Sequence, residues 1–266
     1  MSFFANRAQR WVCAAPLFFG LGIAPLPGTE IKLSERRSGY TFMTPETQRM
    51  QDDRTINPGT LWVLEGEALW GQKAGDAGRS CAGCHGSARI SMKGVAARYP
   101  AYDAARGRPI NLEQRINLCR AERQRATPFA YESKELLALT AFVATQSRGR
   151  KIAPPPDKRL RPFRDAGRAF FNLRQGQLNL SCAQCHDDNW GRRLAGAVIP
   201  QAHPTGYPLY RLEWQSAGSL QRRLRNCLIG MRAEPFEYGA PEYVTLELYL
   251  MWRARGMAIE TPAVRP

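Results

Sequence analysis

Two short segments of the chain share a Cys-x-x-Cys-His pattern, which constrains the fold more than any other feature. They run from Cys81 to His85 and from Cys182 to His186. In each, two thiols can attach covalently to one edge of a porphyrin while the adjacent histidine binds the iron. Zinc knuckles are the alternative, but a histidine directly after the second cysteine is poorly placed to complete a tetrahedral site. We therefore expect two covalently bound haem c groups. The residues that would hold them are Cys81, Cys84, Cys182 and Cys185 as attachment points, with His85 and His186 as iron ligands.

The surroundings of the first motif recur around the second. Matched residues lie 101 positions apart up to the motifs and 107 or 108 apart after them, so the second copy carries an insertion of seven residues. Agreement over this length indicates two copies of one domain rather than chance. The matched pairs include Gly66 with Gly167, Tyr99 with Tyr207, Cys119 with Cys227, Tyr131 with Tyr238 and Gly149 with Gly256.

Helices are expected at both ends of each copy. Apolar periodicity predicts helices over residues 61–72 and 132–147 in the first copy, and over 163–173 and 242–255 in the second. Gly66 lies where another helix could cross closely, and Gly149 is placed to cap a helix end. No segment alternates for long enough to predict a sheet. The fold class expected is mainly α, with two tandem cytochrome-c-like domains related by an internal repeat.

The N-terminus resembles a secretory signal, with two arginines followed by an apolar run that is too short and interrupted to span a membrane. Because covalent haem attachment also requires export, we expect a periplasmic protein. Three consecutive prolines at 154–156 favour a stiff link between the copies. The expected organisation is a signal peptide (1–27), an N-terminal extension (28–57), a first cytochrome-c-like domain (58–150), a proline-rich linker (151–162) and a second cytochrome-c-like domain containing the active site (163–266).

The chain is strongly basic, with a formal net charge of +15. Such a charge is typical of nucleic-acid-binding proteins. Here, however, it comes from scattered arginines rather than a basic helix. We therefore expect it to attract acidic protein partners or an anionic substrate, and we expect no nucleic-acid or membrane partner.

The distal iron ligand decides what such a haem can do. His203 is the only spare histidine, and the first copy has no histidine to match it, so we expect a surface or loop residue. The methionines do not match between the copies. Cys119 and Cys227 do match, and each ends an i, i+4, i+7 pattern with two aliphatic residues. On a helix this spacing puts the thiol on the apolar face. We predict His/Cys ligation of both haems; the alternative is a disulfide between Cys119 and Cys227.

A thiolate ligand lowers the potential of a haem and favours sulfur chemistry over simple electron relay. Arg223 lies one helical turn before Cys227, where it could lower the thiol pKa and hold an oxyanion. Arg115 has the same place relative to Cys119, so Arg223 alone does not distinguish the second copy. The alternative is that these arginines only neutralise haem propionates.

Together these features resemble SoxA, the family of di-haem subunits of the SoxAX cytochrome complexes of bacterial thiosulfate oxidation. The resemblance runs from about residue 38 to the C-terminus. Besides the haem motifs and spare cysteines, it rests on Ser38-Gly39-Tyr40, Pro45-Glu46-Thr47, Met50-Gln51-Asp52-Asp53, Asn57-Pro58-Gly59 and Leu61-Trp62-Val63.

The resemblance implies an L-cysteine S-thiosulfotransferase. Such an enzyme joins thiosulfate oxidatively to a cysteine of the carrier protein SoxYZ, and passes two electrons through haem to the partner subunit SoxX and a soluble cytochrome c. Carried over, Cys227 is the catalytic residue, often a persulfide, and with His186 it ligates the active-site haem. Arg223 matches the active-site arginine. His85 and Cys119 ligate the other haem.

Two other functions fit the residues less well. A plain di-haem electron-transfer cytochrome would use the thiolates only to set potentials, and its function would not depend on Arg223. A haem peroxidase needs an open or displaceable distal site, which a pair of thiolate ligands argues against.

Overall fold

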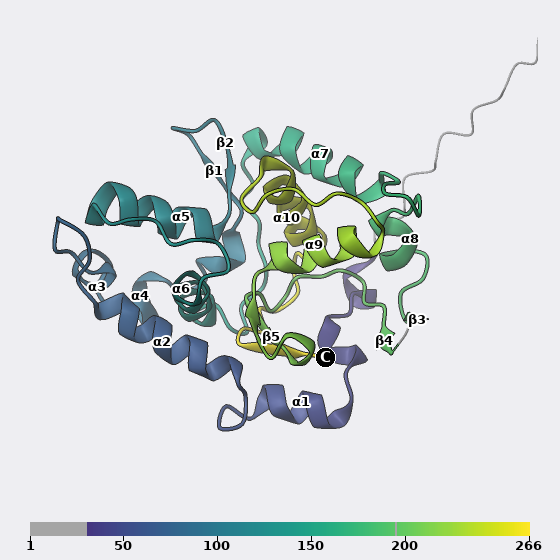
Figure 1. The fold of residues 1–266 in the computed structure, drawn as a ribbon, viewed down its shortest axis with the longest axis horizontal. Helices are drawn as coiled ribbons and strands as arrows, with labels where there is room; N and C mark the ends of the chain where they lie inside the picture. Colours follow the sequence, from purple (N-terminus) through teal and green to yellow (C-terminus); the bar gives the residue numbers. More distant parts are fainter. Residues whose placement is uncertain (1–30, 195) are drawn as a thin grey trace, which may run out of the picture.

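The chain is described by a computed structural model that covers residues 31–194 and 196–266. The signal peptide expected at residues 1–27 lies outside these residues. Within them, no helix is long and apolar enough to cross a membrane. Figure 1 shows two helical halves side by side, with α1 (Pro45–Asp52) below them near the C-terminus.

The first half follows the layout expected from the sequence. Helix α2 precedes the haem motif, which itself forms the short helix α3, and α5 carries the spare cysteine before α6 ends the copy. The elements are α2 (Gly59–Gly71), α3 (Cys81–His85), α4 (Ala88–Ser91), η3 (Ala96–Arg98), β1 (Ala101–Asp103), β2 (Arg108–Ile110), α5 (Leu112–Cys119), η4 (Arg120–Gln124) and α6 (Lys134–Thr145).

The second half repeats this order with one additional hairpin. The elements are η5 (Lys158–Leu160), α7 (Arg161–Asn172), α8 (Cys182–His186), β3 (Arg193–Leu194), β4 (Ala197–Val198), β5 (Leu209–Arg211), η6 (Leu212–Trp214), β6 (Ser216–Gly218), α9 (Leu220–Gly230), α10 (Pro241–Arg253) and β7 (Ala263–Arg265). The hairpin β3–β4 lies in the stretch where the repeat offset changes, so it contains the insertion seen in the sequence.

Two glycines allow the first and last helices of each half to cross closely. A methyl group at Gly66 on α2 would collide with the carbonyl of Ala138 on α6 and lie 2.7 Å from Cβ of Phe142. In the second half, a methyl group at Gly167 on α7 would collide with the carbonyl of Thr245 on α10. Only glycine fits such a backbone approach. The close crossing predicted at Gly66 is confirmed and recurs at the equivalent position.

The prediction that Gly149 caps α6 is wrong by three residues. The helix ends earlier, with Gln146 as its C-cap in a right-handed conformation. Gly149 lies in the turn beyond it, with φ of 76°, and Gly256 after α10 has φ of 84°. Both glycines therefore serve the chain reversal after the helix, where a positive φ is required.

The structure also contains short strands that the sequence did not predict. The structure has two two-stranded hairpins, β1–β2 and β3–β4, and a three-stranded sheet in the order β6-β5-β7. Strands of two or three residues are too short to show alternation in the sequence. These short strands nevertheless follow the repeat, because β1–β2 and β5–β6 occupy equivalent places in the two halves.

The N-terminal extension packs on the second half although it precedes the first. The amide of Asn57 donates to the carbonyl of Pro262 at 3.0 Å, and Gln51 accepts a hydrogen bond from the backbone of Val264 at 3.1 Å. Helix α1 thereby lies against β7 at the C-terminus (Figure 1). No local pattern could have revealed this contact, since its partners lie about 200 residues away.

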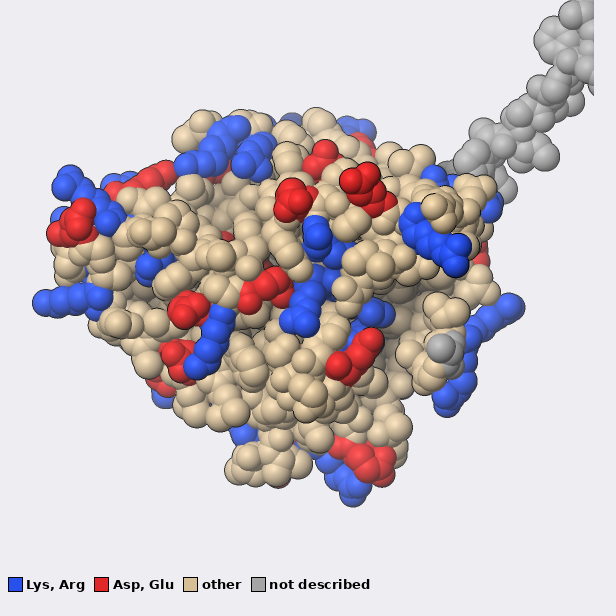
Figure 2. All heavy atoms as spheres, in the orientation of Figure 1, with Lys and Arg blue, Asp and Glu red and all other residues tan. Residues whose placement is uncertain are grey.

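The linker between the halves starts as a packed segment. Ile152 is buried and donates its backbone N–H to the carbonyl of Met257 at 2.8 Å, while the backbone N–H of Ala153 donates to Ala97 at 2.9 Å. It therefore joins elements of both halves before the prolines begin. On the molecular face in Figure 2, basic side chains are interspersed with acidic ones, which fits the scattered charge of the sequence.

Candidate functional site

The second haem motif forms a capped turn that presents both thiols and the imidazole. Ser181 and Gln184 make reciprocal hydrogen bonds at the N-terminus of α8, which fixes the turn. His186 Nδ1 lies 2.6 Å from the carbonyl of Pro200 and can donate its proton there, which leaves Nε2 available to a metal. Burial lowers the pKa of His186 to about 4, so the imidazole is neutral, as an iron ligand must be.

A cavity of about 350 Å³ separates His186 from α9. One face of α9 lines it through Leu220, Arg223, Leu224 and Cys227, at the spacing i, i+3, i+4, i+7. The sequence predicted this helical face, and the structure places Cys227 and His186 on the walls of the same cavity.

His203 brings to the cavity a buried nitrogen without a partner among the described residues, which a bound prosthetic group can serve. His203 lies in the cavity wall, and its Nδ1 is 2.9 Å from the carbonyl of Arg37. Its Nε2 is buried and has no hydrogen-bond partner within the described part of the chain. Because Nδ1 donates to Arg37, Nε2 of the neutral ring is an acceptor, and a haem propionate can serve it as the protonated acid or through a bridging water. The expectation of a surface residue is wrong, since only 7% of His203 is exposed; that it lies in a loop is right.

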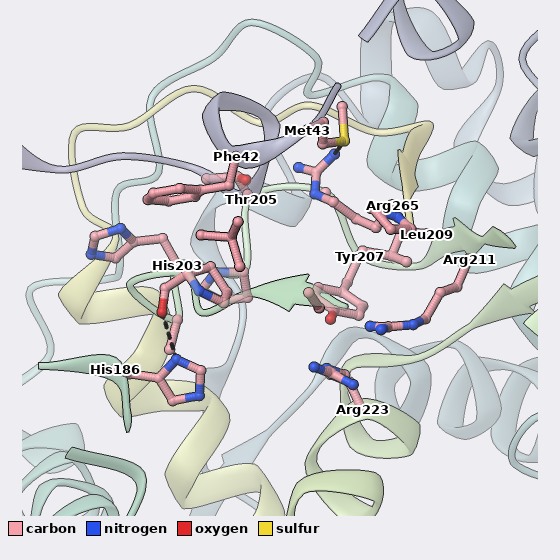
Figure 3. Close-up of a pocket in the computed structure, with 18 of the residues that line it drawn as sticks. Phe42, Met43, His186, His203, Thr205, Tyr207, Leu209, Arg211, Arg223 and Arg265 are labelled. Carbon is pink, nitrogen blue, oxygen red and sulfur yellow. Dashed lines mark hydrogen bonds between the residues drawn. The ribbon is translucent and has the colours of Figure 1, made fainter. Parts of the chain in front are cut away.

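Residues that the sequence reasoning missed complete the wall. The N-terminal extension contributes Phe42, Met43 and Thr47, and the C-terminal strand contributes Arg265 (Figure 3). The hairpin β3–β4 adds Arg193 from the inserted segment. The change in repeat offset marked the insertion, but it gave no indication that the inserted residues line a site.

Besides Arg193, three arginines from different elements line this cavity, and two of them, Arg223 and Arg211, lie close together at one end. Figure 3 shows Arg223 of α9 near Arg211 of β5, with Tyr207 beside them and Arg265 above. Arg211 is 2.7 Å from Glu213, whose side chain is 61% exposed, and Arg265 pairs with Glu260. Across the residues that the structure covers, Arg223 forms no ion pair with a carboxylate. The cavity therefore has a positive end with one uncompensated guanidinium.

The first half places its haem motif and its spare cysteine on equivalent helices, but its histidine is more exposed. His85 is exposed at the end of α3, and its ring lies 5.7 Å from that of Trp70. Cys119 ends α5, and burial together with the Cys119 thiol raises the pKa of Cys81. The charge of Cys119 thus reaches Cys81 in the same copy; that Cys119 ligates the first haem stays a prediction.

The arginine before the spare cysteine is neutralised in the first copy only. Arg115 donates to the buried carboxylate of Asp103 at 2.7 Å. The residue equivalent to Asp103, by its place at the end of β1 and of β5, is Arg211. The second copy therefore has a base where the first has an acid, which distinguishes Arg223 from Arg115.

No two of the six cysteines in the described residues form a disulfide, so Cys119 and Cys227 are not joined. That alternative is ruled out in this structure. Each cysteine instead lies on the helix of its own half.

Comparison with known proteins identifies the family. The chain matches the family of the SoxA/TsdA cytochrome c domain twice, over residues 65–152 and 166–259. It is 38% identical over 232 residues to the L-cysteine S-thiosulfotransferase subunit SoxA of Pseudaminobacter salicylatoxidans, covering 87% of this chain and 81% of that protein. The chain belongs to the SoxA family. Its cofactor is therefore covalently bound haem c rather than zinc.

Further SoxA proteins support this assignment. The subunit from Rhodovulum sulfidophilum is 36% identical over 234 residues, covering 88% of this chain and 82% of that protein. The crystal structure of SoxXA from P. pantotrophus superposes with a TM-score of 0.83 at 31% identity, covering 87% of both chains. The mainly helical fold with two cytochrome c domains is confirmed.

Proposed function

We propose that this chain is the catalytic subunit of a periplasmic L-cysteine S-thiosulfotransferase. In this function it holds two haem c groups and pairs with SoxX. It joins thiosulfate to the carrier cysteine of SoxYZ, and its electrons pass through haem to SoxX and a soluble cytochrome c. The names of the similar proteins support the activity, and the SoxXA structure supports the partner.

One observation carries the assignment of the active site to the second copy. Arg211 replaces the acid that neutralises the equivalent arginine in the first copy. A dianion such as thiosulfate is held best by guanidinium groups that are not already paired. Arg223 is such a group, and Arg211 adds a second positive charge beside it (Figure 3).

The reacting group in this proposal is the thiolate of Cys227. The Cys227 thiolate bonds to the outer sulfur of thiosulfate, which forms a Cys227–S–S–SO₃⁻ group and releases two electrons. Haem supplies the outlet for these electrons. The carrier thiolate then attacks the same sulfur, takes the S–SO₃⁻ group and restores the Cys227 thiolate by exchange. Arg223 and Arg211 hold the sulfonate oxygens through both steps.

We assign one histidine and one cysteine to each haem iron as its ligands. His186 and Cys227 would ligate the active-site haem, attached through Cys182 and Cys185. His85 and Cys119 would ligate the other, attached through Cys81 and Cys84. Low-temperature EPR of the oxidised holoprotein tests this, because low-spin His/thiolate signals from both haems are expected, and His/Met or high-spin signals would contradict the ligand set.

The decisive experiment compares Cys227→Met with Cys119→Met in the complete haem-loaded complex. Methionine keeps a sulfur ligand, so both variants should retain haem, which absorbance checks. We expect Cys227→Met to lose thiosulfate- and carrier-dependent cytochrome c reduction by more than about 100-fold, and Cys119→Met to retain most of it. Unchanged turnover in the Cys227 variant would overturn the assignment.

A further inference from the structure

Two carboxylates meet between the two halves without a cation. Glu113 lies in the first turn of α5 and Glu247 near the middle of α10. Both line a cavity of about 60 Å³, a space large enough for a water molecule. Within residues 31–194 and 196–266, neither forms an ion pair with a lysine, arginine or histidine.

The partners of Glu247 are neutral amides. Gln221 of α9 donates to it at 2.7 Å, and Asn111 donates at 3.3 Å. Glu247 is only 6% exposed, so two amide bonds replace bulk solvation. Both amides donate to Oε1 of Glu247, so Oε2 can carry a proton without the loss of either hydrogen bond.

The other titratable groups near the pair do not supply positive charge to it. The loop before α6 brings Tyr131, whose pKa is raised by burial and by the two glutamates, and Glu132, which interacts with Arg222 of α9. Tyr99 and Tyr207 complete the cavity wall from the segments that precede β1 and β5. Burial and the nearby charge of Glu132 raise the pKa of Glu113, and burial together with Glu113 raises the pKa of Glu247.

The cavity is placed between the two haem regions. On the first side its wall includes Tyr99 and Leu112, which pack in the core around the first haem motif. On the second side its wall includes Tyr207 and Leu220, which also line the cavity between His186 and Cys227. These four residues are two pairs of repeat equivalents, so the acid pair lies at the centre of the pseudo-symmetric interface.

We propose that Glu113 and Glu247 form a proton-binding site that takes up a proton when the adjacent haems are reduced. An electron taken up by a haem held beside this interface would add one negative charge there. A proton from solvent then binds the carboxylate pair and compensates that charge, and it is released when the electron leaves. In a low-dielectric interface the two charges interact strongly. The reaction under the proposed function supplies the electrons, so the site would couple that oxidation to proton movement.

The test is the pH dependence of the haem midpoint potentials in the haem-loaded complex, measured by spectroelectrochemistry without thiosulfate. We expect the wild-type potential of at least one haem to fall as pH rises between about 5 and 9. A tenfold difference in proton affinity between the two redox states corresponds to about 59 mV for one electron. Glu247→Gln keeps the amide hydrogen bonds and should flatten this dependence, as should Glu113→Gln.

Glu242→Gln is the matched control, because Glu242 is an exposed carboxylate on the same helix. It should keep the wild-type slope. The proposal is overturned if wild-type potentials do not change with pH, if both buried-site variants keep the wild-type slope, or if the control flattens equally. Thiosulfate turnover is scored separately, so failure of the proposed function would not be mistaken for failure of this site.

Stability gives a second readout with a defined sign. The pKa values of both glutamates are raised in the folded protein above the ordinary value of a glutamate. The folded state therefore binds the proton more tightly, and this contribution to stability is lost as pH rises through the folded pKa. Thermal stability of Glu247→Gln should therefore fall less than that of wild type toward alkaline pH; an identical fall would count against a shared buried proton.

Discussion

The two halves of this molecule share the same arrangement of helices but differ in the residues that lie around each haem motif. In the first, His85 is exposed and Arg115 is neutralised by Asp103. In the second, the inserted hairpin β3–β4 and the N-terminal extension line a cavity next to His186, and Arg211 replaces the acid. Helix packing is nearly the same in both. The two halves thus share one scaffold, while a few charges and one insertion leave the arginine before the spare cysteine unpaired with an acid, within the described residues, in the second half only.

The largest effect should come from giving the second site the charge of the first. Arg211→Asp would place a carboxylate beside Arg223, as Asp103 stands beside Arg115. We expect kcat/KM for thiosulfate to fall by about 10²- to 10³-fold, because two oxyanion contacts are weakened together. Steady-state kinetics with thiosulfate and the carrier would measure this.

The matched control is Glu213→Gln, which removes the exposed acidic partner of Arg211 and leaves the positive charge of Arg211 in place. Its turnover should stay near wild type. Arg211→Asp could instead lower the haem content and leave the KM for thiosulfate unchanged. In that case Arg211 pairs with a haem propionate, and the difference between Asp103 and Arg211 concerns haem binding rather than thiosulfate binding.

The next effect tests whether the scaffold is equally constrained in both halves. Gly66→Ala and Gly167→Ala each force a methyl group into the backbone of the crossing helix. We expect each to lower the free energy of unfolding by about 2–3 kcal/mol, measured by chemical denaturation of the holoprotein. Gly71→Ala, where a methyl group meets nothing within 4 Å, should be neutral or slightly stabilising. A large loss in only one half would show that the two crossings are not equivalent in energy.

Much of this arrangement could be predicted from the sequence, because it depends on local pattern. The haem motifs, the repeat, the close crossing at Gly66 and the helical face of Cys227 all follow from spacing. Asp103 and Arg211 are 108 positions apart, so the sequence alone shows that an acid in the first copy is replaced by an arginine in the second. Only the structure shows that Asp103 lies beside Arg115 and that Arg211 lies beside Arg223. The N-terminal wall and the burial of His203 depend on contacts between distant segments, which no periodicity encodes.

A smaller effect concerns the acid that neutralises the first site. Asp103→Asn removes the charge that pairs with Arg115 at 2.7 Å and Arg106 at 3.6 Å. Because both arginines are partly exposed, water can replace part of the interaction, and we expect a loss of about 1–2 kcal/mol. Glu46→Gln breaks an exposed pair with Arg49 and should leave the free energy of unfolding essentially unchanged. Equal losses in the two variants would mean that Asp103 has no special role in stabilising the first half.

The smallest effect lies where the two halves meet. Tyr131 and Tyr238 are repeat equivalents whose rings stack on each other, with centroids 6.0 Å apart and planes at 12°. A double-mutant cycle of Tyr131→Leu and Tyr238→Leu should give a coupling energy of about 0.5–1.5 kcal/mol. Denaturation of the four proteins measures it, and a coupling energy near zero would show that the stack adds nothing beyond burial. Because each ring is the counterpart of the other, a positive coupling would mean that the repeat supplies both sides of its own interface. That would explain how duplication could join two small haem domains without a separate set of contacts.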